Sequence, residues 1–229
     1  MTLELDNVVE IPDLRNLTGI FRNRLHAGTV LADMLISFGD TESLVLGIPA
    51  GGVPVAAPIA SKLNLILDVA VVSKITLPWN TEAGYGAVAF DGTVKLNNDM
   101  VSQIGLTNDQ IKSGVETALN KVHRRFKEFR GDKPFPDTKN QNIILVDDGI
   151  ASGFTMLVAV EAIKRIGANK IIVAVPTAHL KSLKIVAPEV DSIFCANIRG
   201  GWGFAVADAY KNWYDVDEKE VIEILKETI

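Results

Sequence analysis

One short stretch, residues 143–155, constrains the fold of this chain more than any other part of it. It reads Ile143-Ile144-Leu145-Val146-Asp147-Asp148-Gly149-Ile150-Ala151-Ser152-Gly153-Phe154-Thr155. The four apolar residues predict a buried strand, two aspartates follow it directly, and glycines and hydroxyl residues lead into a helix. An isolated aspartate pair would be an ordinary acidic turn. The complete order of strand, acid pair, glycine loop and helix indicates a binding site instead.

Strands and helices alternate along the chain, which predicts an α/β fold with a mostly parallel sheet covered by helices on both faces. The expected strands are 43–48, 68–73, 142–146, 170–175 and 192–196, with a hairpin of 86–90 and 93–97 around Asp91-Gly92, a dipeptide favoured by type I′ turns. The expected helices are 18–38, 53–63, 107–130, 153–166 and 217–228. Ligands bind beyond the carboxyl ends of such strands, so we expect the site after Ile48, Ser73 and Val146.

Composition excludes several classes of protein. The 229 residues suit one globular domain, with 48% hydrophobic and 22% charged residues. A net charge of −5 argues against a nucleic-acid partner. Cys195 is the only cysteine, which excludes an intramolecular disulfide and a cysteine-cluster metal site. The N-terminus lacks the order of a signal peptide, and uncharged segment 44–61 is rich in glycine and proline, so we expect a cytoplasmic protein without a membrane partner.

The loop after the aspartates has the chemistry of an anion site. A helix N-terminus presents free backbone N–H groups and the positive end of the helix dipole. Gly153 would let the backbone approach a phosphate closely, and Ser152 and Thr155 would add hydroxyl donors. Carboxylates beside a phosphate repel it unless a sugar diol donates to them or a divalent cation intervenes. The combination indicates a ribose phosphate, with its phosphate in the loop and its diol on Asp147 and Asp148.

Two other anion-binding patterns fit less well. A phospho-acceptor receiver domain also begins with a strand and an acidic pair, but about a hundred residues should follow it, and this acid pair lies too near the end of the chain. A Walker motif is excluded because no Gly-Lys-Ser/Thr is present.

The string at Asp147 resembles the phosphoribosyl-diphosphate signature of type I phosphoribosyltransferases. Residues 46–56, which include Ala50-Gly51-Gly52, resemble the pyrophosphate loop of that superfamily. Residues 71–75 resemble the following strand with its lysine, Lys74. Residues 21–24 and 212–214 match a subgroup of predicted phosphoribosyltransferases, and the similarity covers most of residues 20–215.

The resemblance implies a single phosphoribosyltransferase-like domain over residues 1–229. Its core would span about 18–196, a small hood would use the N-terminal segment and about 197–229, and residues 76–97 would form a mobile hairpin lid. The implied activity is that of a pentosyltransferase. It transfers ribose 5-phosphate from phosphoribosyl diphosphate, with Mg²⁺, to a nitrogen acceptor such as a nucleobase, and releases pyrophosphate. The alternative is a non-catalytic protein of the same fold that senses phosphoribosyl diphosphate or a nucleotide.

The resemblance also implies residue roles. Asp147, Asp148 and Lys74 would be catalytic, and Mg²⁺ would be bound through the ligand with help from the two aspartates. The 5′-phosphate would be held by Gly149, Ile150, Ala151, Ser152, Gly153, Phe154 and Thr155. Pyrophosphate would contact Ala50, Gly51 and Gly52, and an acceptor base would contact Trp202 and Phe204.

Three positions depart from related patterns. The subgroup commonly has arginine where this chain has Ala50, which removes a charge for pyrophosphate. Phe154 stands where small residues are frequent. Ala151 stands where hypoxanthine-guanine enzymes carry an aspartate, which argues against a 6-oxopurine acceptor that uses that group.

Other charged residues receive structural interpretations. The basic residues that end the helix 107–130 would complement its dipole on a solvated face, and they are Lys121, Arg124, Arg125, Lys127 and Arg130. The histidines form no ligand spacing, so we expect no metal bound by protein ligands alone. The sequence leaves a homodimer open.

Overall fold

A six-stranded parallel sheet forms the centre of the molecule. The computed structural model describes residues 6–227, the side chains of residues 81 and 82 excepted. The strand order is β1-β9-β8-β7-β2-β3, and every neighbouring pair is parallel. The strands are β1 (Val8–Val9), β2 (Leu44–Gly47), β3 (Ile66–Val69), β7 (Asn142–Val146), β8 (Lys170–His179) and β9 (Ser192–Arg199). The predicted parallel sheet is confirmed.

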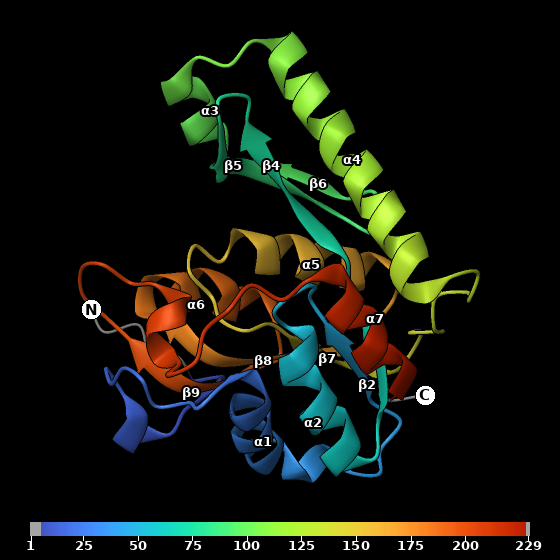
Figure 1. Ribbon diagram of the computed structural model, residues 1–229, viewed down its shortest axis with the longest axis vertical. Coiled ribbons are helices and arrows are strands. Elements are labelled where there is room, and N and C mark those ends of the chain that lie inside the picture. Colours follow the sequence, from blue (N-terminus) through green and yellow to red (C-terminus); the bar gives the residue numbers. More distant parts are fainter. Residues whose placement is uncertain (1–5, 228–229) are drawn as a thin grey trace.

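Helices cover both faces of this sheet (Figure 1). Helices α1 (Arg24–Met34) and α2 (Val53–Leu63) lie on one face, and α5 (Phe154–Arg165) and α6 (Leu180–Val186) lie on the other. Side chains alternate between the faces along each strand. Val45 of β2 therefore packs in the cluster with α1 and α2, whereas its neighbours Leu44 and Leu46 pack in the cluster with α5 and α6.

Residues 72–130, called the arm below, leave the sheet between β3 and β7 (Figure 1). The arm contains an antiparallel sheet of β4 (Val72–Leu77), β5 (Asn80–Ala89) and β6 (Val94–Leu96), followed by α3 (Asn98–Ile104) and α4 (Asn108–Arg130). Helix α4 packs closely on the small sheet at Gly114, where a Cβ atom would lie 2.2 Å from the Tyr85 hydroxyl oxygen.

The far end of α4 returns to the core beside α7 (Glu218–Glu227), as Figure 1 shows. Arg125 Nε lies 2.6 Å from Glu218 Oε1, and Arg124 Nη1 lies 2.9 Å from Glu218 Oε2. Short 3-10 helices complete the described chain, at Pro12–Leu14, Ile36–Phe38, Ala187–Glu189 and Val206–Ala209. No helix within residues 6–227 is long and apolar enough to cross a bilayer.

Most predicted elements occur near their predicted bounds, and α4 begins at a capping box formed by Thr107 and Gln110. The strand predicted over 68–73 is wrong, because the chain there leaves the large sheet after β3 and starts β4 in the arm. The residues on both sides of this change are apolar and buried, so nothing in the sequence marks it. Lys74 consequently lies within β4, opposite Ala87, and not at a strand end.

Other local predictions also differ from the structure. The helix predicted over 18–38 begins only at Arg24, where the Asn23 side chain accepts a hydrogen bond from the His26 N–H. A type I′ turn needs positive φ at two positions, but only Gly92 has it in the turn after β5, with φ +86°. The short helices α3 and α6 were not predicted. The mobility of the lid stays a prediction.

Candidate functional site

Asp147 and Asp148 follow β7 at the carboxyl edge of the parallel sheet. The Asp148 N–H donates to Asp147 Oδ1 at 2.8 Å, and no other hydrogen bond from the described residues reaches the Asp147 carboxylate. Burial raises the pKa of Asp147 well above its ordinary value, and the neighbouring charge of Asp148 raises it further. A ligand that brings hydrogen-bond donors or positive charge to Asp147 would therefore stabilise the ionised carboxylate.

Arg24 holds Asp148, and sequence reasoning assigned it no role. Its Nε and Nη2 atoms both lie 2.9 Å from Asp148 Oδ2, and Nη1 donates to the Tyr214 carbonyl at 2.8 Å. The guanidinium carbon lies 3.9 Å from the centroid of the Trp213 ring. Two segments that both match the same family subgroup, residues 21–24 and 212–214, thus meet in space. Their joint occurrence in that subgroup is the sequence signal for a contact between them.

The loop 149–155 is held by the core at several points. Ile150 forms a bridge with β8, in which its N–H donates to the Thr177 carbonyl and its carbonyl accepts from the His179 N–H, both at 3.0 Å. The Ser182 hydroxyl donates to the Ala151 carbonyl. Gly153 has φ +82°, a conformation that other residues rarely adopt.

The donors of this loop remain available. No hydrogen bond within residues 6–227 uses the N–H groups of Ser152, Gly153 or Thr155. The loop also stands at the N-terminus of α5, whose dipole favours an anion. Phe154 does not obstruct it, because its side chain lines a neighbouring hollow with Leu157 and Ile185.

The second glycine loop follows β2 and touches the acid pair. A Cβ atom on Gly51 would lie 1.9 Å from Asp148 Oδ2, and one on Gly52 would lie 2.9 Å from the Asp147 Cα atom. Both glycines are thus required by the close packing of the two loops. The Gly52 N–H donates to the Ile48 carbonyl at 3.0 Å, so among the described residues of this loop only the N–H groups of Ala50 and Gly51 are left for an anion.

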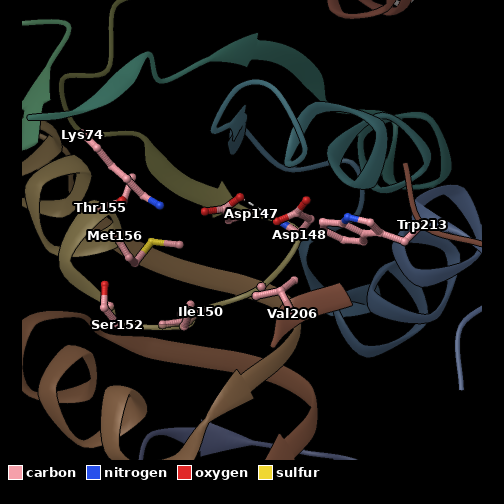
Figure 2. A pocket seen from close by; sticks show the side chains of 12 residues that line it. Lys74, Asp147, Asp148, Ile150, Ser152, Thr155, Met156, Val206 and Trp213 are labelled. Atoms are coloured by element: carbon pink, nitrogen blue, oxygen red, sulfur yellow. Dashed lines mark hydrogen bonds between the residues drawn. The ribbon is translucent and has the colours of Figure 1, made fainter. Parts of the chain in front are cut away.

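Two adjoining cavities meet at the acid pair. One, of about 280 Å³, is lined by the loop 149–153 together with Val206 and Trp213. The other, of about 330 Å³, is lined by residues 48–51 and by residues of the arm. Both are lined by Lys74, Asp147, Asp148 and Thr155. Figure 2 shows the first cavity, with the Lys74 side chain extending toward Asp147 and Trp213 beside Asp148.

The aromatic residues at the site differ from those predicted. Trp202 is fully exposed, and neither it nor Phe204 lines either cavity. The Phe204 ring instead contacts His179 edge-on and lies over the Arg199 guanidinium. Trp213, to which the sequence analysis gave no role at the site, stacks on Arg24 and also lines the first cavity.

The donor set suits a divalent cation that arrives with its ligand. No cluster of three or more metal-binding side chains occurs in the described residues. Mg²⁺ is commonly held by one or two carboxylates together with substrate phosphates and waters. The Asp147 oxygen that accepts no hydrogen bond, at the junction of the two cavities, fits this mode of binding.

The structure brings together the acid pair and the two glycine loops for which the sequence resembles type I phosphoribosyltransferases. The model of the phosphoribosyl transferase domain family matches residues 21–209, and the chain belongs to this family. It is 32% identical over 206 residues to "Putative phosphoribosyl transferase Rv0571c" of Mycobacterium tuberculosis, and equally to its counterpart MT0597 in a second strain.

The match to these curated relatives covers 90% of this chain but 46% of theirs, so the chain spans about half their length. Among solved structures, the chain is similar to TT1426 from Thermus thermophilus, with 30% identity and a TM-score of 0.73. That similarity covers 91% of this chain and 98% of TT1426. The fold class predicted from the sequence is confirmed by this likeness.

Proposed function

We propose that the protein is a phosphoribosyltransferase that transfers ribose 5-phosphate from phosphoribosyl diphosphate to a small nitrogen acceptor, most simply a nucleobase. One observation carries the proposal. The two cavities join at Asp147 and Asp148, with unused backbone N–H groups in a loop on each side. A ligand with two anionic ends and a diol between them matches this order of donors and acceptors. Phosphoribosyl diphosphate has that order.

In the proposed reaction the bond between the anomeric carbon and the pyrophosphate oxygen breaks, and a bond from that carbon to the acceptor nitrogen forms. Pyrophosphate leaves with the electron pair, and the proton of the acceptor nitrogen passes to the departing pyrophosphate or to water. Positive charge develops on the ribose ring, which the carboxylates of Asp147 and Asp148 stabilise. Lys74 stabilises the negative charge that develops on the pyrophosphate. Arg24 positions Asp148 and touches no substrate atom in this scheme.

Mg²⁺ fits the site as a partner of the substrate. It would be held by Asp147, with Asp148 beside it, and by substrate oxygens, and when bound it neutralises charge on the diphosphate. The first cavity leaves the acceptor near Trp213 and Val206, which offer an aromatic and an apolar wall. We therefore propose Trp213 as the aromatic contact of the acceptor, in place of Trp202.

Release of pyrophosphate is the decisive measurement. The protein is mixed with phosphoribosyl diphosphate, Mg²⁺ and single members of a panel of nucleobases and other nitrogen compounds. We expect release that depends on one acceptor class. Thermal unfolding in the same mixtures measures binding, for which saturation at a hundred times Kd gives about 2.7 kcal/mol. Binding without release from any acceptor would favour the non-catalytic sensor. No thermal shift with millimolar ligand would contradict both functions.

A further inference from the structure

The positive charge at the second cavity comes from the arm and not from the core. The core contributes the acid pair and the loop at Ala50 and Gly51. This loop carries no cationic side chain. Across from them the arm contributes Lys74 of β4 and two residues of α4, Lys121 and Arg125. All the cations that line this cavity therefore lie within residues 72–130.

Lys121 and Arg125 face the cavity together because they are four residues apart on one helix. This placement differs from the expectation that the basic residues of this helix cover a solvated face. The Lys121 side chain forms no hydrogen bond or ion pair with the described residues, 6–227. Partial burial and the nearby charges of Arg125 and Arg124 lower the pKa of Lys121, so positive charge is crowded here.

Arg125 is held from the core side. Glu218 of α7 binds both Arg124 and Arg125, and the Arg125 side chain is only 19% exposed. Glu218 is thus shared by two arginines, and Arg124 pairs with Glu128 as well. Two carboxylates face the three cations Lys121, Arg124 and Arg125, so the group keeps one positive charge in excess, and Lys121 is the member without an ion pair. A compact polyanion in the cavity would balance that excess.

We propose that Lys121 and Arg125 bind the diphosphate of the substrate and the pyrophosphate product, together with Lys74 and the backbone of Ala50 and Gly51. The inference rests on the proposed function and adds to it the residues that recognise the leaving group. The ligand class is a diphosphate, because the cavity is small and lies directly beside the carboxylates that face the ribose. The arm then supplies the charge that the loop lacks at Ala50.

The test measures binding of inorganic pyrophosphate, with Mg²⁺, by isothermal titration calorimetry. We expect Lys121→Gln and Arg125→Gln each to weaken pyrophosphate binding by roughly tenfold or more, the loss typical of a charged hydrogen bond. Lys127→Gln removes the same charge from the same helix, but Lys127 lines neither cavity. The Lys127→Gln protein should therefore bind pyrophosphate as tightly as the parent protein does. Ribose 5-phosphate has no diphosphate and should bind all four proteins equally.

The outcomes separate this inference from the proposed function. Parental pyrophosphate affinity in folded Lys121→Gln and Arg125→Gln proteins would overturn the inference, and continued turnover by the parent would preserve the proposed function. An equal loss in Lys127→Gln would also overturn it, because the effect would then be one of net charge. If the parent binds ribose 5-phosphate but no pyrophosphate, the inference fails alone. If it binds neither these ligands nor phosphoribosyl diphosphate, both fail.

Discussion

The two ends of the site are built in different ways. The proposed phosphate end, called the phosphate end below, is one continuous segment, residues 149–155, between a buried strand and a helix. The proposed diphosphate end gathers residues 50–51, Lys74, Lys121 and Arg125 from separate parts of the chain. The first is fixed by the core through bridges and packing, whereas the second depends on how the arm rests on α7. The position of the arm therefore determines most of the geometry at the diphosphate end, whereas Lys74 is the one residue of the arm that lines the cavity at the phosphate end.

The largest expected effect comes from the acid pair that both ends share. Changing Asp147 and Asp148 together to asparagine removes the charge and keeps the shape. We expect turnover to fall roughly a hundredfold or more, because the carboxylates act most strongly as charge develops on the ribose. Steady-state kinetics with phosphoribosyl diphosphate and the acceptor measures this. Inorganic phosphate, which has no diol, should bind at least as well as to the parent protein.

Two results would contradict that interpretation. Weaker phosphate binding in a folded double variant would mean that the acids support the shape of the loop. An unchanged turnover rate would remove them from the mechanism. The phosphate measurement probes only the end at residues 149–155, so it also tests whether that end is independent of its neighbour.

Arg24→Gln tests the contact that joins the acid pair to the C-terminal segment. Arg24 is 5% exposed and is paired with Asp148, and removing one partner of a buried pair costs roughly 3 kcal/mol or more. We expect a loss of about this size in the free energy of unfolding, measured with urea. Arg24→Lys keeps the positive charge but not the planar guanidinium group, so it should lose less unfolding free energy than Arg24→Gln. Equal unfolding free energies of the parent and the Arg24→Gln protein would show that the Arg24–Asp148 pair makes no net contribution to stability.

The continuous end of the site is visible in the sequence, whereas for the assembled end the family resemblance named residues 50–52 and Lys74 but not Lys121 or Arg125. The strand, acid pair, loop and helix at 143–155 are contiguous, so the sequence predicts their local structure, and the roles of their residues stay proposals. Lys121 and Arg125 are indistinguishable in sequence from other basic residues near a helix end. Only the packing of α4 on β4 and β5, and of its last turns on α7, brings them to the cavity.

The same reasoning explains the errors in the fold. The strand predicted over 68–73 is locally well formed, and its division between two sheets depends on distant pairing partners, β2 and β5. Arg24 is another case, because its partners lie at Asp148 and Tyr214. Helix α4 was predicted well because its capping box and apolar stripe are local signals.

Asp147→Asn alone should change how stability depends on pH. The pKa of Asp147 is raised in the folded protein, so the folded state binds a proton that the unfolded state releases above about pH 4. Stability of the ligand-free protein is therefore full below pH 4 and falls as pH rises through the folded-state pKa. Asparagine removes this dependence. We expect a gain on the order of 2–4 °C in Tm at neutral pH, the effect of ~1 kcal/mol.

Thermal unfolding between pH 4 and 8, without ligand or Mg²⁺, measures this difference. The two proteins should unfold at similar temperatures near pH 4 and diverge as pH rises. Glu161→Gln is a suitable control, because Glu161 is a half-exposed carboxylate on α5 that pairs with Lys95 outside the site. Parallel pH curves for Asp147→Asn and the parent would mean that burial of Asp147 carries no stability cost.

The smallest effect, and the sharpest comparison of the two ends, is expected from Ala50→Arg. This change adds to the core loop the charge that the arm otherwise supplies. In the Lys121→Gln protein, Ala50→Arg should recover part of the lost pyrophosphate affinity. A partly exposed charge contact contributes about 0.2–1 kcal/mol, which is at most about fivefold. Ala50→Met controls for side-chain size, and ribose 5-phosphate binding should stay constant because the phosphate end is untouched.

Equal effects of arginine and methionine would mean that the loop at Ala50 does not face the diphosphate. A change in ribose 5-phosphate affinity would mean that the two ends are coupled through the acid pair.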